Sequence, residues 1–142
     1  MRPDVLAIIP ARGGSKGLPR KNLRVLAGKP LVVHSIERAR QSHWVTRVVV
    51  STDDPEIAEV ARQAGAEVPF LRPNELARDD TPDWPVFSHA LEWFSAQERY
   101  RPTLVVHLRP TTPIRRVEVM DRAIHTFQQR MDVESLRSVS PA

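Results

Sequence analysis

The sequence contains no cysteine among its 142 residues. It therefore has no disulfide, no thiolate metal ligand and no cysteine nucleophile. No apolar run approaches the length of a membrane span, and no signal-peptide pattern opens the chain, so we expect a cytoplasmic protein without a membrane partner. Glycine is also scarce, with five residues in all. Three of these glycines gather in one short basic stretch, which is the part of the sequence that most directly indicates chemistry.

The basic stretch covers residues 8–22 and reads IIPARGGSKGLPRKN. It combines its glycines with four cations and contains no acid. Glycine lets the backbone turn with positive φ and bring its N–H groups close to an anion, and Arg12, Lys16, Arg20 and Lys21 add positive charge. The stretch, called the basic loop below, therefore predicts a phosphate site. A solvated surface loop is the alternative interpretation.

The glycine spacing of the basic loop excludes two common phosphate motifs. The P-loop requires G-x-x-x-x-G-K-S/T, and the dinucleotide fingerprint requires G-x-G-x-x-G at the start of a helix. A long basic loop without either spacing favours a nucleotide-transferring enzyme over an ATPase. Such an enzyme needs no nucleophile of its own, because the acceptor hydroxyl attacks phosphorus while the protein orients the reactants and neutralises charge.

The chain has a formal net charge of +4, which raises the question of nucleic acid binding. Several of the cations lie in the basic loop, and no basic face with interleaved aromatic residues appears elsewhere. A small anionic ligand accounts for the cluster, so we predict no nucleic acid partner. The length suits a single nucleotide-binding domain over residues 1–142.

Strand and helix patterns alternate along the chain. The predicted strands are short apolar runs at residues 5–10, 47–51, 67–71, 103–108 and 136–139. The predicted helices begin near Pro30, at Pro55, at Val86 and at Val117, and a polar loop covers residues 72–85. Asp54 is placed to cap the helix from Pro55, and Gly65 to end it. This alternation predicts an α/β fold with an open, mostly parallel, Rossmann-like sheet and helices on both faces.

Ligands of such a sheet bind outside the carboxyl ends of its strands. The residues at the predicted ends are Ala11, Arg12, Thr52, Asp53, Arg72 and Arg109. We therefore expect three arginines and the basic loop to converge on one edge of the sheet. That edge would form a site for a highly anionic ligand.

Asp53 is the carboxylate predicted to lie at a strand end near the basic loop. It is a candidate magnesium ligand, but two adjacent acids before a proline are typical helix starters, so we favour turn and cap chemistry. The five histidines show no metal-ligand spacing, and we assign no residue to a metal site. Trp84 and Trp93 are expected to pack in the core, with contact of Trp84 to a nucleotide base as the alternative.

Four strings lie in order along the chain: PARGGSKGLPRKN followed by GKPL, VVSTDDPEIA, RPNELA followed by DT and HAL, and LRPTTPIR. Together they resemble the acylneuraminate cytidylyltransferases, the CMP-sialic acid synthetases. The related enzymes that activate 3-deoxy-manno-octulosonate share the architecture but carry a different basic loop. The resemblance implies a reaction in which the anomeric hydroxyl of a sialic-acid-like 2-keto-3-deoxy sugar acid attacks the α-phosphate of CTP, so that pyrophosphate leaves and a CMP-sugar forms.

The same resemblance implies roles for individual residues. Arg12 and Lys21 would contact the triphosphate and act as the catalytic cations. The implied nucleotide-binding residues are Ala11, Arg12, Gly13, Gly14, Ser15, Lys16, Lys21, Asn22, Arg72, Asp80 and Thr81. Arg109 and Thr111 would contact the sugar.

The sequence departs from the family pattern in two respects. Arg109 stands where the family usually has a glutamine that touches the acceptor, so an unusual nine-carbon acid of the legionaminic or pseudaminic type is a candidate acceptor. Family members also continue past the equivalent of residues 138–142 into a sugar-binding and dimerisation segment with an aspartate pair that binds Mg²⁺. The resemblance thus implies Mg²⁺ with ligands beyond these residues and a homodimer for full-length members. A non-catalytic nucleotide-binding fragment or module is the alternative function.

Overall fold

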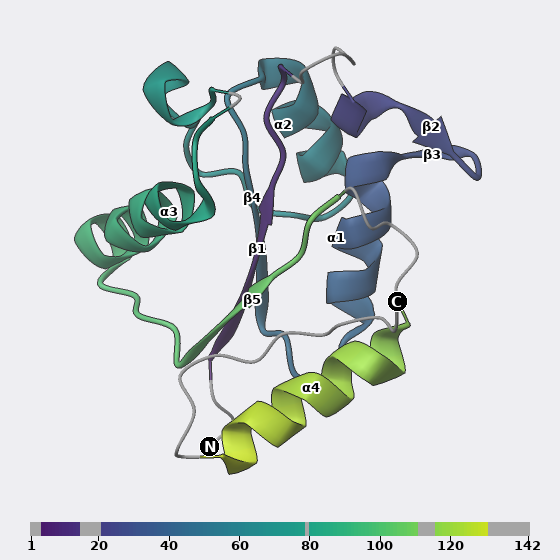
Figure 1. Cartoon of the computed structure of the whole chain (residues 1–142), viewed down its shortest axis with the longest axis vertical. Coiled ribbons are helices and arrows are strands. Elements are labelled where there is room, and N and C mark those ends of the chain that lie inside the picture. Colours follow the sequence, from purple (N-terminus) through teal and green to yellow (C-terminus); the bar gives the residue numbers. More distant parts are fainter. Residues whose placement is uncertain (1–3, 15–20, 79, 111–115, 131–142) are drawn as a thin grey trace.

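A three-stranded parallel sheet forms the centre of the computed structural model, which describes residues 4–14, 21–78, 80–110 and 116–130. Its strand order is β4-β1-β5, with β1 at Val5–Pro10, β4 at Arg47–Ser51 and β5 at Leu104–His107. Both neighbours run parallel to β1, which lies between them in Figure 1. The limits of β1 and β4 are those predicted from their consecutive apolar residues, and β5 lies within the predicted fourth strand.

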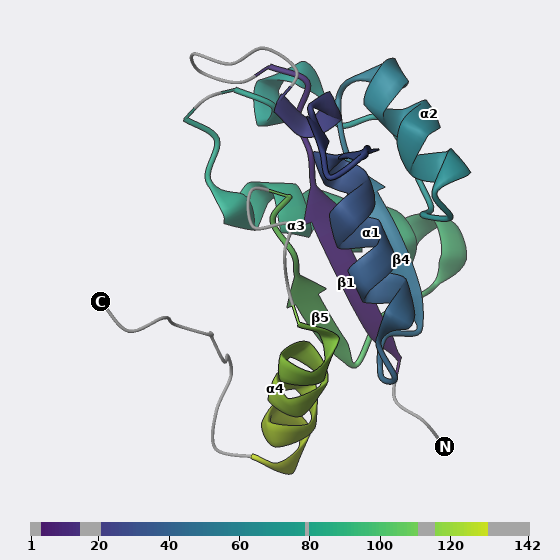
Figure 2. The ribbon, with the colours of Figure 1, turned by 90° about the vertical axis from the view of Figure 1, so that its right-hand side faces the viewer.

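Helices cover both faces of the sheet. Helix α3 (Asp83–Glu98) lies on one face, and α1 (Leu31–Gln41), α2 (Pro55–Gln63) and α4 (Val117–Gln129) lie on the other (Figure 1). Figure 2, turned by 90°, shows α1 in front of β1 and β4, with α4 beside β5. The predicted α/β class is confirmed. Over the described residues, none of the helices combines the length and the hydropathy needed to cross a bilayer.

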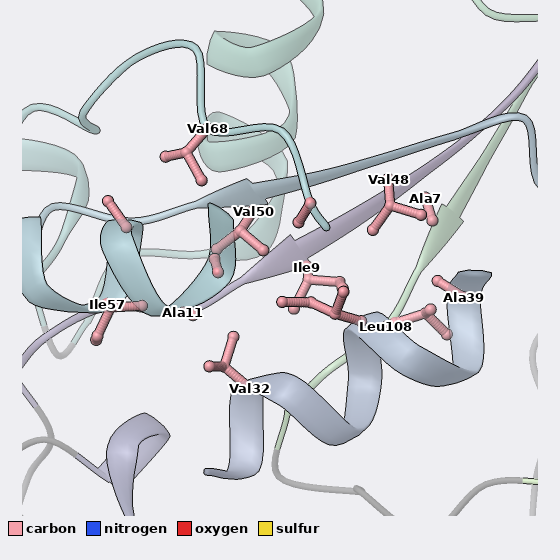
Figure 3. Close-up of a cluster of buried hydrophobic side chains, with 14 of the residues drawn as sticks. Ala7, Ile9, Ala11, Val32, Ala39, Val48, Val50, Ile57, Val68 and Leu108 are labelled. Atoms are coloured by element: carbon pink, nitrogen blue, oxygen red, sulfur yellow. The ribbon is translucent and has the colours of Figure 1, made fainter. Parts of the chain in front are cut away.

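The side chains of β1 point alternately to the two faces of the sheet and so contribute to two separate core clusters. Ala7 and Ile9 pack with residues of α1, α2 and α4, and Figure 3 shows both in this cluster, with Ala7 next to Val48 of β4. Leu6 and Ile8 point to the other face, where they pack against α3. Successive side chains of a strand point to opposite faces, so a strand with helices on both sides must be apolar at every position. All four side chains are fully buried, which fixes β1 and therefore the residues that follow it.

Helix α2 begins and ends at the residues that the sequence indicated. The side chain of Asp54 accepts hydrogen bonds from the backbone N–H groups of Glu56 (2.8 Å) and Ile57 (3.4 Å). Pro55 occupies the first helical position, where its missing N–H costs no hydrogen bond. Gly65 follows the helix with a φ of 100°, a left-handed conformation that glycine adopts without strain.

The prediction of a strand at residues 67–71 is wrong, because this segment forms only an isolated bridge with β4. Glu67 makes a single parallel bridge, donating to Val48 O (2.9 Å) and accepting from Val50 N (3.0 Å). Pro69 is the next residue that would face β4 in the same ladder, and it has no N–H to donate. The ladder therefore stops after one residue. The strand predicted at 136–139 lies outside the described residues.

A small hairpin between the basic loop and α1 was not predicted. Its strands are β2 (Val25–Leu26) and β3 (Lys29–Pro30), joined by Ala27 and Gly28 with φ values of 51° and 82°. Two positive φ angles in a two-residue loop match the turn that suits the twist of hairpin strands. The hairpin places Pro30 directly before α1 rather than within its first turn.

Helix α3 starts at Asp83, three residues before the predicted Val86, so the polar loop is shorter than expected and contains a 3-10 turn at Asn74–Leu76. Val86, Ala90 and Phe94 face the sheet at helical spacing. Trp84 lies two residues before Val86 and thus on the opposite side of the helix. It is 69% exposed, and the expectation that it packs in the core is wrong.

Truncation of Phe94 tests the packing of α3. Phe94 is fully buried beside Leu6 and Ile8, so Phe94→Ala should lower the free energy of unfolding by about 3–5 kcal/mol. Trp84→Ala removes an aromatic ring from the exposed side of the same helix and should change the free energy of unfolding by less than about 0.5 kcal/mol. Urea unfolding followed by far-UV circular dichroism measures both. Equal losses in the two variants would contradict the assignment of the buried face.

Candidate functional site

A cleft of about 270 Å³ opens at the carboxyl ends of the strands. It is lined by residues that follow β1 and β5, by the end of the basic loop and by the segment that leads into α3. Its described lining consists of Pro10, Arg12, Gly14, Lys21, Asn22, Arg72, Arg78, Thr81, Asp83, Val86, Arg109 and Pro110. Five cations face one carboxylate in this set, so the cleft suits an anionic ligand.

Hydrogen bonds join the two sides of the basic loop to each other and to the end of β4. The Nδ2 atom of Asn22, in a 3-10 turn at Lys21–Leu23, donates to the carbonyl oxygen of Arg12 (3.0 Å). On the other side, Gly13 N donates to Asp53 Oδ1 (2.8 Å) and Ala11 N donates to Ser51 O (2.9 Å). These contacts hold Arg12 and Lys21 at the cleft, where both were predicted to lie.

Gly13 is packed so closely that it has no room for a side chain. A Cβ atom at this position would lie 2.7 Å from Asp54 Oδ2 and 2.8 Å from Asp54 Cβ. Gly14 has no atom within 4 Å of the equivalent position. The two glycines of the pair thus have different roles, since only Gly13 allows the loop to pass close to the start of α2.

Arg72 is buried under the cleft, with 5% of its surface exposed. Its Nε and Nη2 atoms donate to Ser51 Oγ (3.1 Å) and Ser51 O (2.6 Å), and Nη1 donates to Leu76 O (3.0 Å). Burial lowers the pKa of Arg72 to about 10, while the charge of Asp53 opposes this change and that of Arg12 adds to it. Arg72 remains protonated at neutral pH. It joins the end of β4 to the turn at Asn74–Leu76 and gives the cleft a fixed positive charge.

Arg109 follows β5 and forms an ion pair with Asp83, the first residue of α3. Both side chains are partly exposed, and both line the cleft. The sequence left two roles open for Arg109, contact with an acceptor or pairing with a neighbouring acid. The structure shows the ion pair within the cleft wall, so the pair is part of the site.

The predicted convergence of Arg12, Arg72 and Arg109 on one edge of the sheet is confirmed. The predicted site residues that line the cleft are Arg12, Gly14, Lys21, Asn22, Arg72, Thr81 and Arg109. Ala11 and Gly13 lie beneath it, and their N–H groups donate within the protein rather than to a ligand. Asp80 is exposed and is not part of the lining. Ser15, Lys16 and Thr111 lie outside the described residues.

Arg78 and Asp83 are cleft residues that the sequence did not single out. Thr81 is held in a tight turn with Arg78, donating from its N–H to Arg78 O (3.1 Å) and accepting at Oγ1 from Arg78 N (3.0 Å). This turn brings Arg78 to the cleft. The available signal was the turn-rich composition of the segment that follows a predicted strand end.

Asp53 accepts the Gly13 N–H and does not cap α2, so the expected cap role for Asp53 is wrong and belongs to Asp54 alone. Among the described residues, no group of three or more histidine, aspartate or glutamate side chains is arranged to hold a metal ion. His89 packs edge-on against Phe70, and burial together with the charge of Arg72 lowers its pKa. His89 is therefore neutral at neutral pH.

Comparison with known proteins shows which family shares these features. A family model described as Cytidylyltransferase matches residues 6–141. The chain is 42% identical over 137 residues to a CMP-N,N'-diacetyllegionaminic acid synthase of Legionella pneumophila, covering 96% of this chain and 58% of the relative. It is 41% identical over 124 residues to a pseudaminic acid cytidylyltransferase of Campylobacter jejuni, with 87% and 53% covered. It is 36% identical over 140 residues to an N-acylneuraminate cytidylyltransferase of Escherichia coli, with 99% and 32% covered. The chain thus spans between a third and three fifths of these relatives.

Solved structures agree on the fold. A structure of CMP:2-keto-3-deoxy-manno-octonic acid synthetase complexed with CTP superposes with a TM-score of 0.76 at 24% identity, covering 92% of this chain and 49% of that one. A cytidylyltransferase of Leptospira borgpetersenii gives a TM-score of 0.70 at 23% identity, with 92% and 51% covered. At these identities the likeness shows a shared Rossmann-like fold.

Substitution of the two glycines tests the packing at the base of the basic loop. Gly13→Ala should lower the free energy of unfolding by about 1–3 kcal/mol, because its methyl group overlaps Asp54 and the backbone must shift. Gly14→Ala, next in the chain and open to solvent, should change it by less than about 0.5 kcal/mol. Chemical denaturation measures both variants. A harmless Gly13→Ala would show that the loop does not pass as close to Asp54 as described.

Proposed function

Because this chain belongs to the cytidylyltransferase family, we propose that it provides the nucleotide site of an enzyme that transfers CMP from CTP to a sialic-acid-like 2-keto-3-deoxy sugar acid. The anomeric hydroxyl of the acid would be the acceptor, and pyrophosphate would be released. The names of the relatives support this reaction, since each describes a cytidylyltransferase or a CMP-sugar synthase.

The observation that carries the proposal is the group of cations around one cleft. Arg12 and Lys21 come from the basic loop, Arg72 and Arg78 from the segment before α3, and Arg109 from the exit of β5. They meet at the carboxyl edge of a parallel sheet, where nucleotides bind in folds of this type. A triphosphate carries enough negative charge to balance such a group.

These residues supply charge and position rather than a nucleophile. In the proposed step the acceptor oxygen forms a bond to the α-phosphorus, the bond from that phosphorus to the oxygen bridging to the β-phosphate breaks, and the acceptor proton passes to solvent water. Negative charge grows on the departing pyrophosphate. Arg12 and Lys21, whose backbone is hydrogen-bonded beside the cleft, would stabilise that charge.

The acceptor is the less determined of the two substrates. Relatives of 36–42% identity are named for legionaminic, pseudaminic and N-acylneuraminic acids. All three acids carry a carboxylate, and the guanidinium of Arg109 is able to bind such a group through two parallel hydrogen bonds. We propose that Arg109 contacts the acceptor and that a nine-carbon sugar acid is its partner. Thr111, for which the same role was inferred, remains a prediction.

Magnesium is the cofactor implied by the family resemblance. The described residues offer no preformed ligand group, and the one candidate, Asp53, has a carboxylate oxygen bonded to Gly13 N. They do not fit a magnesium site by themselves, so we derive no step through the metal. We propose that any metal ligands lie outside the described residues.

Two further features belong to the proposal. The first is a cytoplasmic location, which the sequence led us to expect and which stays a prediction. The second is a homodimer, which the resemblance implies for full-length members of the family and which stays a prediction. Gel filtration with light scattering tests it.

The central test is CTP binding by the chain, followed by pyrophosphate release. We expect calorimetry to detect CTP binding by the purified protein, and pyrophosphate release in Mg²⁺ to depend on an added keto-deoxy sugar acid from a panel of legionaminic, pseudaminic and N-acetylneuraminic acids. No binding of CTP would defeat the proposal. Binding without release across the panel, also in a version extended to the length of its relatives, would favour a non-catalytic nucleotide-binding module.

Neutral substitutions of the two loop cations test the phosphate site. Arg12→Ala and Lys21→Ala should each weaken CTP binding by about tenfold or more, and should lower turnover in an active enzyme by about a hundredfold. Arg122→Ala removes the same charge from α4, away from the cleft, and serves as the control (Figure 1). Calorimetric titrations at one ionic strength compare the three variants. Equal affinity in all of them would indicate that the basic loop is only a solvated surface loop.

Substitution of Arg109 tests the acceptor assignment. In a version of the protein extended to the length of its relatives, Arg109→Gln should change the ranking of kcat/KM among the sugar acids while KM for CTP stays nearly constant. The cause is the loss of a fixed cation that grips a carboxylate. Steady-state kinetics over the panel measures this. An unchanged ranking would mean that the Arg109–Asp83 pair only supports the cleft wall.

A further inference from the structure

The carboxylate of Asp53 joins two segments that are far apart in the sequence. Asp53 follows β4, and its Oδ1 atom accepts a hydrogen bond from Gly13 N at 2.8 Å across 40 residues. Gly13 stands at the point where the chain leaves β1 and enters the basic loop. A hydrogen bond with an ionised acceptor is about twice as strong as one between neutral groups. It fixes the direction of the peptide between Arg12 and Gly13.

The neighbouring acid has a different task, which makes the contact of Asp53 specific. Asp54 caps α2 through the N–H groups of Glu56 and Ile57, and its side chain closes the space beside Gly13. Gly13 therefore donates a hydrogen bond to one aspartate and packs against the side chain of the other. Asp53 and Asp54 together hold the first residues of the basic loop after β1 in place.

Asp53 also acts on the charges of the cleft. Its carboxylate is close enough to Arg72 to oppose the lowering of the pKa of that residue, whereas Arg12 repels Arg72. A negative charge near two cations that repel each other lowers the free-energy cost of keeping them together in an unliganded protein. Asp53 is a half-buried acid that follows β4 and supplies such a charge.

We infer that Asp53 is a positioning residue: by binding the Gly13 N–H and offsetting the repulsion between Arg12 and Arg72, it holds the basic loop in the arrangement that receives phosphates. The inference deepens the proposed function and depends on it for the choice of CTP as ligand. It differs from a magnesium role, in which Asp53 would act only when the metal is present.

The first experiment needs no ligand and therefore tests the inference separately from the proposed function. Amide hydrogen exchange, followed by NMR, should show protection of Gly13 in the wild-type protein. Asp53→Ala should speed the exchange of that amide by at least about tenfold, whereas Ala11, whose N–H donates to the backbone of Ser51, should keep its rate. Unchanged exchange at Gly13 would overturn the inference, whatever the result with CTP. A similar acceleration at both amides would mean general unfolding of this edge and would overturn it too.

The second experiment measures CTP affinity by calorimetry, in EDTA and in Mg²⁺. Asp53→Ala should weaken CTP binding by about 10- to 100-fold in both conditions, and Asp53→Asn, which keeps an oxygen acceptor without the charge, should recover part of the loss. Glu59→Gln removes one acid from the exposed surface of α2 and should leave the affinity unchanged. A loss seen only in Mg²⁺ would show a metal ligand and overturn the positioning role. Equal affinity of Asp53→Ala and wild type would also overturn it.

The two proposals fail in different ways. If the wild-type protein does not bind CTP, the proposed function is wrong, and the Gly13 exchange rate still decides whether Asp53 holds the loop. If the wild type binds CTP and Asp53→Ala binds equally well, the proposed function stands and the positioning role is wrong.

Discussion

The position of β1 between β4 and β5 is the constraint on which the site depends. Because both neighbours run parallel to β1, all three strands end at the same edge of the sheet. The residues that follow them, Arg12, Asp53 and Arg109, are thereby brought together although they are far apart in the sequence. The ladders on both sides of β1 fix this alignment, with Ile8 opposite Val49 of β4 and His107 of β5.

Cations gathered at one edge repel each other, and the structure offsets that repulsion with nearby oxygen atoms. Arg72 donates to the carbonyl oxygens of Ser51 and Leu76, Arg109 pairs with Asp83, and the charge of Asp53 favours the protonated form of Arg72. A cleft arranged in this way is ready for an anion before the anion arrives. Such preorganisation reduces the reorganisation needed on binding.

The sequence predicted those parts of the fold that depend on local pattern. Continuous apolar runs identify β1 and β4, and the Asp54 cap identifies the start of α2. The hairpin at residues 25–30 was missed because two-residue strands carry no periodicity and its turn uses an alanine at positive φ. The bond between Asp53 and Gly13 was missed because a contact across 40 residues depends on strand pairing, which no local pattern contains. The sequence did contain evidence against a strand at 67–71, because Pro69 has no N–H group to continue a ladder.

Arg72 and Arg109 both line the cleft, but dissolved ions screen their charges to different extents. The pair between Arg109 and Asp83 has side chains that are 58% and 47% exposed, so dissolved ions screen it readily. Arg72 is 5% exposed, so dissolved ions screen its hydrogen bonds much less. Ionic strength therefore acts unequally on this cleft: rising salt weakens the attraction between Arg109 and Asp83 and has little effect on the buried charge of Arg72.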